Sequence, residues 1–175
     1  MSQFGTGTWV DAVKNSIPEH LSHLERNIEI VMTQHGLDEI DAHACALAAA
    51  IASGNGELAF EISMNGPLFG KVERELVAQA VVSISIDTVY LSYLDAADIA
   101  DYTSTKPHPL EIFEPIVTDE TGKAAMYAFV TAIVLQQNRA FALVEMLNGR
   151  GYTREQVQGI AAIAAVISSI NKIGV

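Results

Sequence analysis

The chain contains 175 residues, of which 50% are apolar and 18% charged, and its formal net charge is -11. This apolar content excludes a disordered chain, and the length suits one domain of about 100–200 residues. A negative chain without a cluster of Lys and Arg repels phosphates, so we expect no nucleic-acid partner and no anionic membrane surface. The single cysteine, Cys45, excludes an internal disulfide and is typical of a reducing compartment.

Two segments bear on membranes and secretion. Residues 1–8 lack a cationic segment followed by an apolar core, so we expect no secretory signal and a cytoplasmic protein. Residues 76–94 form the most apolar long stretch, but this stretch contains Gln79, Asp87 and several hydroxyl side chains. Because a membrane span needs about 20 mostly apolar residues, we interpret it as a buried helix of a protein without membrane contact.

Apolar side chains recur at spacings of three and four residues, and no alternating strand pattern extends beyond a few residues. This period is typical of α-helices, so the sequence predicts an all-α fold. Residues 1–15 are expected to form an N-terminal arm, and residues 16–175 a single helical domain. The capping box at residues 16–19, which contains Pro18, is expected to open the first helix.

Caps, glycines and prolines set the expected helix ends. The expected helices cover residues 16–36, 38–54, 57–66, 72 to about 100, 124–147 and 153–170. The connection at residues 106–109 contains two prolines, which disfavour helix. The helix over residues 124–147 is interrupted only by the polar residues 136–139, and Thr153 with Gln156 forms the capping box of the last helix.

Self-comparison indicates an internal repeat. Residues 72–77 resemble residues 152–157, and Ala50-Ile51 matches Ala132-Ile133, at spacings of 80 and 82 residues. Both halves are therefore predicted to contain, in this order, a helix, a short helix, a glycine-containing turn and a helix that begins near an Arg-Glu pair. Such a unit cannot bury its apolar face alone, so we expect two related halves that pack against each other.

The residues over about 16–171 resemble a known family. Residues 132–143 and 147–157, above all the Gly-x-Gly-Tyr-Thr-Arg-Glu-Gln-Val stretch, look like the core of the alkylhydroperoxidase AhpD-like proteins, which belong with the carboxymuconolactone decarboxylases. Residues 47–62 and 88–90 are similar to the first half of that family. The resemblance implies an all-helical fold and a homo-oligomer, commonly a trimer or a hexamer.

The peroxidase chemistry of this family requires a Cys-x-x-Cys pair, in which one thiolate attacks peroxide and the other resolves the sulfenic acid. The two cysteine positions correspond here to Gln136 and Arg139. The histidine of the family corresponds to Leu143 and its relay glutamate to Ala124. None of these four side chains exchanges protons at neutral pH, so dithiol peroxidase activity is not expected.

The sequence offers two other kinds of candidate site. Cys45 lies in an alanine-rich helix, where a free cysteine usually behaves as a small buried hydrophobe; a redox role for Cys45 alone is the alternative. His20 and His23 share a helix face but lack nearby ligands, and Asp95 with its acidic neighbours is interpreted as a solvated face. We expect no metal site and no cofactor.

The remaining candidate site consists of polar groups in apolar helices. Gln136 and Arg139 would share a helix face at i,i+3, and a buried Arg needs a carboxylate, a carbonyl or a ligand anion. Asp87 is the expected partner, with Tyr90 one turn further along its helix. These four residues are either a structural ion pair that fixes helix register or the lining of a small polar pocket.

The sequence predicts an AhpD-like oligomer that has lost the thiol peroxidase site and binds a small molecule between its helices. One alternative is an enzyme of the carboxymuconolactone decarboxylase type, for which Asp87 would be the acid or base. The other alternative is a residual one-cysteine peroxidase, which requires an exposed Cys45.

Overall fold

The computed structural model describes residues 9–67, 70–96 and 114–173, and for residues 90–96 and 114–115 it describes the backbone alone. In these ranges the regular structure is helical throughout, which confirms the expected all-α class. The α-helices are α1 (Trp9–Ser16), α2 (His23–Thr33), α3 (Glu39–Ala52), α4 (Gly56–Asn65), α5 (Lys71–Ala96), α6 (Glu114–Thr118), α7 (Lys123–Val134), α8 (Ala140–Gly149) and α9 (Arg154–Asn171). A 3-10 turn, Glu19–Leu21, precedes α2.

Helices α3 and α7 form the centre of the core. Every residue from 41 to 50 in α3 and from 124 to 132 in α7 is buried. Helices that are apolar on all sides are interior helices, and their many alanines allow the neighbouring backbones to approach. The two helices contact each other, and each also contacts both α5 and α9.

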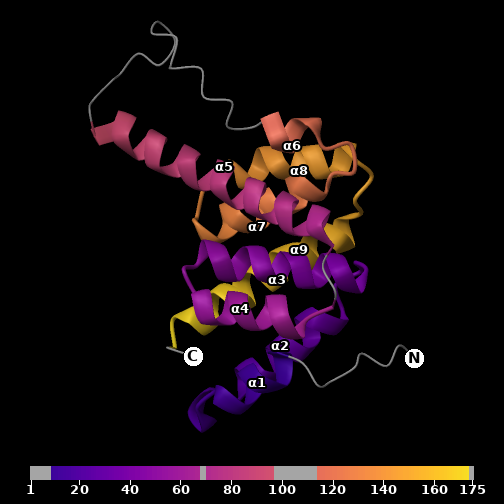
Figure 1. The fold of residues 1–175 in the computed structure, drawn as a ribbon, viewed down its shortest axis with the longest axis vertical. Coiled ribbons are helices and arrows are strands. Elements are labelled where there is room, and N and C mark those ends of the chain that lie inside the picture. Colours follow the sequence, from indigo (N-terminus) through magenta and orange to yellow (C-terminus); the bar gives the residue numbers. More distant parts are fainter. Residues whose placement is uncertain (1–8, 68–69, 97–113, 174–175) are drawn as a thin grey trace, which may run out of the picture.

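The other helices surround this centre. Figure 1 shows α1 and α2 at one end of the long axis and α6 and α8 at the other end, with α3 and α7 between them. Helix α5 has 26 residues, or about 39 Å at 1.5 Å per residue, and its C-terminal part extends past its neighbours (Figure 1). None of the helices in the described part of the chain is both long and apolar enough to cross a membrane.

The N-terminal region differs from the expectation. Residues 9–15, which are expected to belong to the arm, form α1 together with Ser16, because Trp9 is fully buried and packs edge to face on His43 with ring centroids 5.8 Å apart. Ser16 ends this helix, and its hydroxyl donates to the carbonyl of Val13 at 2.6 Å. The capping box expected at residues 16–19 is therefore wrong: the 3-10 turn after Pro18 begins without a side-chain cap.

Two further boundaries were expected differently. The long helix is described only as far as Ala96, so residues 97–113, including the expected connection at 106–109, lie outside the described residues. The apolar segment 124–147 forms two helices, α7 and α8, separated by a turn at residues 135–139. The four polar residues therefore end one helix and precede another.

The helix order repeats along the chain. Helices α3, α4 and α5 have 14, 10 and 26 residues, and α7, α8 and α9 have 12, 10 and 18. The pairings are crossed, because α3 packs on α9 while α7 packs on α5. This arrangement is consistent with the internal repeat, and the relation of the two halves by duplication stays a prediction.

Candidate functional site

The turn between α7 and α8 contains the four polar residues 136–139. Helix α7 ends in a glycine-type C-cap: the Gln136 N–H donates to Ile133 O at 3.0 Å, and the Gln137 N–H donates to Ala132 O at 2.8 Å. Gln136 consequently adopts a left-handed backbone conformation with φ of 56°, which glycine usually occupies. This turn changes the direction of the side chains that a continuous helix would have aligned.

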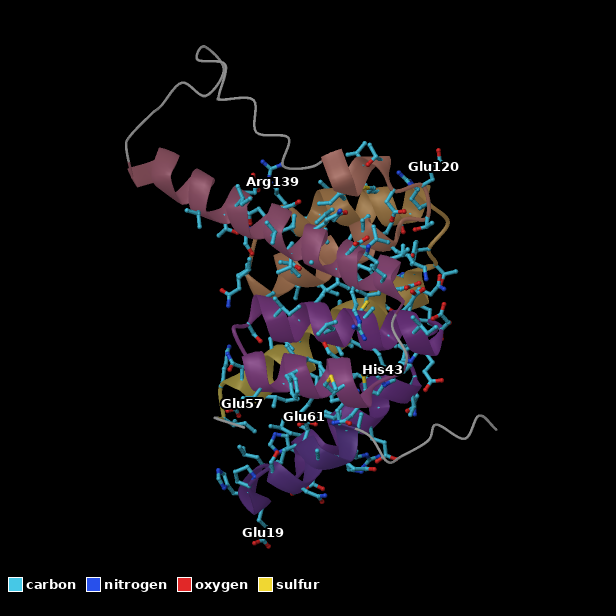
Figure 2. All side chains as sticks on the ribbon, viewed as in Figure 1. Glu19, His43, Glu57, Glu61, Glu120 and Arg139 are labelled. Atoms are coloured by element: carbon cyan, nitrogen blue, oxygen red, sulfur yellow. The ribbon has the colours of Figure 1, made fainter. Side chains whose placement is uncertain are left out.

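Arg139 and Asp87 form the expected ion pair. Arg139 Nε lies 2.5 Å from Asp87 Oδ2, with the Asp87 side chain 3% exposed and the Arg139 side chain 42% exposed. Burial raises the pKa of Asp87 above its usual value, and the charge and hydrogen bond of Arg139 oppose this rise. Figure 2 shows Arg139 beside α5, which carries Asp87. The pair joins the α7–α8 turn to the long helix.

Gln137, which was not singled out from the sequence, makes the second connection to α5. Its side-chain amide donates to Ile84 O at 3.2 Å and to the hydroxyl of Thr88. Gln136 instead is exposed, so the shared face expected for Gln136 and Arg139 is wrong, since the turn breaks the helical register. The Tyr90 side chain lies outside the described residues.

Cys45 lies in the middle of α3. The residue is 0% exposed, and burial raises the pKa of its thiol well above the usual value, with the charge of Asp41 acting in the same direction. The exposed thiol that a one-cysteine peroxidase requires is absent at this position. Within the described ranges, no group of three His, Cys, Asp or Glu side chains is arranged to hold a metal ion.

A polar pocket of about 230 Å³ opens at the other end of α7. It is lined by Asp38 and Asp41 at the start of α3, by Thr121 before α7, and by Arg150, Tyr152 and Gln156 around the start of α9. Because α7 has 12 residues, this pocket lies roughly 16 Å along the helix from the Arg139 turn. In Figure 2, Glu120, the neighbour of Thr121, lies at the upper right, and Arg139 lies further to the left.

Asp41, which lines the pocket, forms an ion pair with Lys123. Lys123 Nζ lies 2.7 Å from Asp41 Oδ1, with both side chains largely buried. Burial raises the pKa of Asp41, Lys123 opposes this rise, and the neighbouring Asp38 adds to it. Burial acts to lower the pKa of Lys123, but the bond to Asp41 and its charge outweigh burial and raise it. The pair therefore keeps Lys123 charged.

Two tyrosines lie close to this pair. Burial raises the pKa of Tyr152 to about 12, and Asp41 and Cys45 act in the same direction. Tyr127, one helical turn after Lys123, is fully buried, and its hydroxyl makes no hydrogen bond to a described residue. Burial, together with the charges of Cys45, Asp41 and Tyr152, raises the pKa of Tyr127. A buried hydroxyl without a protein partner usually marks a place for water or a ligand atom.

The pocket was missed from the sequence, although part of the signal was visible. Asp41 lies with Asp38 and Glu39 at the start of an apolar helix, and it is buried there. Its partner Lys123 is the first residue of α7. The assembly of three helix starts around one pocket depends on tertiary packing, and no local pattern predicts it.

Comparison with known proteins gives no match: no protein-family model matches the chain, and no curated protein matches it at a significant level. The resemblance to the AhpD-like proteins therefore stays a prediction from residues 132–157 and the shorter segments quoted with them.

Proposed function

We propose that this chain is an AhpD-like protein that has lost dithiol peroxidase chemistry and binds a small molecule. The observation that carries the proposal is the composition of the α7–α8 turn. The resemblance would place the two thiols at Gln136 and Arg139; Arg139 instead pairs with buried Asp87, and Gln137, next to Gln136, bonds to α5. An amide and an ion pair that hold two helices together supply neither a nucleophile nor a resolving thiol.

The environment of Cys45 supports the same proposal. A thiolate is the species that attacks a peroxide, whereas the burial of Cys45 favours the neutral thiol and keeps solvent away from the sulfur. Its neighbours Asp41 and Asp38 also oppose ionisation of the thiol. Cys45 therefore fits a packing role in α3.

The small-molecule part of the proposal is supported by the pocket between α3, α7 and α9. Binding sites commonly combine a concave surface with a few positioned polar groups and titratable residues of shifted pKa. Asp41, Lys123 and Tyr152 meet this description, since all three have shifted pKa values and lie in or beside the pocket. Binding at this position would be separate from the Arg139 turn.

We propose that the chain associates with copies of itself as a trimer or a hexamer. We also propose a cytoplasmic location. The support for self-association is a row of exposed apolar side chains on α5, formed by Val82, Ile86 and Val89 at helical spacing. Phe141 on α8 is 80% exposed. Exposed apolar patches are often interaction surfaces, so light scattering at micromolar concentration should report more than the 18.8 kDa monomer.

A second candidate is an enzyme of the carboxymuconolactone decarboxylase type. The observation that favours it is the raised pKa of Asp87, a buried acid beside an Arg in the turn to which the resemblance assigns the active site. Catalytic use of Asp87 would require substrate to reach a side chain that is 3% exposed. Exchange of substrate α-protons with deuterated solvent, lost in Asp87→Asn, would favour this candidate.

A peroxidase assay tests the main proposal. With tert-butyl hydroperoxide and dithiothreitol, we expect the protein to give the same rate as buffer alone, and Cys45→Ser to behave in the same way. Turnover that disappears in Cys45→Ser would establish one-cysteine chemistry. Turnover that survives the substitution would show a different reaction centre. Either result would overturn the proposal that peroxidase activity is lost.

A further inference from the structure

The pocket between α3, α7 and α9 allows a more specific assignment, which rests on the proposed ligand-binding function. We propose that this pocket binds a small organic cation, a primary ammonium group held by the carboxylates of Asp38 and Asp41 and by the ring of Tyr152. The carboxylates supply acceptors, and the aromatic face of Tyr152 adds a cation–π contact.

Several hydrogen-bond donors of the lining already bond to other groups of the protein. Arg150 donates from Nη1 to Asp119 O, and from Nη2 to Val117 O at 3.0 Å. The side-chain amide of Gln156 donates to Gly36 O at 3.1 Å, and the hydroxyl of Thr121 donates to Asp119 Oδ1 at 2.7 Å. An anionic ligand that used these donors would have to displace these bonds.

The three helix starts around the pocket are also capped by their own side chains. Asp38 accepts from the Asp41 N–H at 2.8 Å in α3, and Thr153 accepts from the Gln156 N–H at 3.2 Å in α9. Asp119 accepts from the Ala124 N–H at 2.7 Å in α7. A helix N-terminus binds anions through unsatisfied N–H groups, so these capped ends are poor anion sites.

The acidic groups outnumber the basic ones around the pocket. Asp41 is 8% exposed and contacts Lys123 through Oδ1, and the nearby Asp38 raises the pKa of Asp41. Three acids, Asp38, Asp41 and Asp119, lie in or beside the pocket together with two bases, Lys123 and Arg150, and a cation relieves the excess of negative charge. The buried Tyr127 hydroxyl, without a hydrogen bond to a described residue, lies near the same pair.

The volume limits the ligand. Pockets for drug-sized molecules measure about 300–1,000 Å³. A pocket of about 230 Å³ is below that range, so it fits an amine with few heavy atoms rather than a nucleotide or a polyamine.

The experiment compares three four-carbon probes of different charge: butylammonium, butanol and butyrate. Backbone amide chemical shifts of the full chain are followed by NMR at pH 7 during titration with each probe. We expect butylammonium alone to shift saturably the amides of Leu37, Thr121 and Tyr152, while the amides of Gln137 and Arg139 stay in place. Asp38→Asn, which keeps the helix cap and removes the charge, should weaken binding about tenfold.

Glu120→Gln is the matched control, because Glu120 is exposed next to Thr121 but does not line the pocket. It should leave butylammonium binding unchanged. Equal binding of butyrate or butanol, or unchanged affinity in Asp38→Asn, would overturn the cation assignment while leaving ligand binding in the pocket intact. If none of the three probes shifts these amides, both the cation assignment and the pocket's role in the proposed function fail.

Discussion

The α3–α4 turn and the α7–α8 turn share a backbone arrangement but differ in the side chains that hold them. In the first, the Gly54 N–H donates to Ile51 O and the Asn55 N–H donates to Ala50 O, both at 3.0 Å. The second has the same pair of bonds from Gln136 and Gln137 to residues 133 and 132. The end of the preceding helix therefore fixes both turns, whatever side chains they carry.

Beyond these bonds, the two turns contact the long helix of the other half in different ways. The Asn171 amide donates to Ser53 O at 2.6 Å, a neutral bond, and α4 begins directly after Asn55. The second turn has two more residues, Asn138 and Arg139, before α8, and Arg139 adds the ion pair with Asp87. The charged contact is thus an addition to a turn that the backbone already defines.

The long helices extend this comparison and give the largest expected effect. Gly159, the sixth residue of α9, lies so close to the loop at His35 that an added Cβ would be 2.3 Å from His35 O. The equivalent position in the other long helix, the sixth residue of α5, is occupied by Leu76. Gly159→Ala should destabilise the protein by about 3 kcal/mol or more, measured by urea unfolding. Gly149→Ala, where a Cβ has open space, should change stability by less than about 1 kcal/mol. Equal effects would contradict the close contact.

Arg139→Ala should have the next largest effect. Removal of the guanidinium leaves the buried Asp87 carboxylate without its partner, but Arg139 is 42% exposed, so the loss is reduced from the 3–5 kcal/mol of a fully buried pair to about 2 kcal/mol. At the other turn, Asn55→Ala removes the cap on the Leu58 N–H and should cost about 1 kcal/mol. A thermal or urea measurement that reversed this order would show that the ion pair contributes little.

The starts of α3 and α7 provide a pH-dependent comparison, since Asp38 caps α3 directly while Asp119 caps α7 from a loop. Burial acts to raise the pKa of Asp119, but hydrogen bonds from Ala124 and Thr121 lower it below its ordinary 3.8. A lowered pKa in the folded state gives stability that is present above pH 3.8 and lost as the pH falls through the folded value.

Asp119→Ala should therefore destabilise the protein by about 1 kcal/mol at pH 7, and the difference from wild type should narrow below about pH 4. The raised pKa values of Asp41 and Asp87 change the pH dependence of stability in the opposite direction. Because they do so equally in wild type and in Asp119→Ala, they cancel in the difference between the two proteins. Glu120→Ala is the neighbouring exposed control. A difference that stayed constant from pH 7 to pH 3 would show that the Asp119 carboxylate does not cap α7.

The left-handed residues of the two turns give the smallest expected effect. Gly54 has φ of 78° and Gln136 has φ of 56°, and only glycine adopts this conformation without a steric cost. Gln136→Gly should stabilise the protein by about 0.5 kcal/mol, and Gly54→Gln should destabilise it by about 1 kcal/mol. Opposite signs in paired unfolding measurements would confirm that the turns share one backbone geometry; a loss in Gln136→Gly would show that the Gln136 side chain matters.

Much of the helix order could be predicted from local signals. Asp38, the glycine at position 54 and the Thr153–Gln156 capping box bound helices where they were expected, because caps and left-handed glycines act within a few residues. Helix α1 was missed, since its one strong signal is the burial of Trp9 against His43, a contact between distant segments.

The candidate site was partly predictable. The contact between Arg139 and Asp87 is present as expected, because a lone charge on an apolar segment requires a partner. Gln136 was expected to share this contact, but Gln137 occupies the place, because a helical register does not continue through a C-cap turn. The pocket at Tyr152 depends on three helix starts brought together by packing.

The most direct test of the central claim, that Arg139 and Asp87 hold the α7–α8 turn to α5 as a structural pair, is a double-mutant cycle. The free energy of unfolding in urea is measured for wild type, Arg139→Ala, Asp87→Ala and the double variant. We expect a coupling of about 1–2 kcal/mol, with the double variant losing less than the sum of the single losses. Losses that add within about 0.3–0.5 kcal/mol would contradict the claim, because two residues that clamp these elements through one contact cannot act independently.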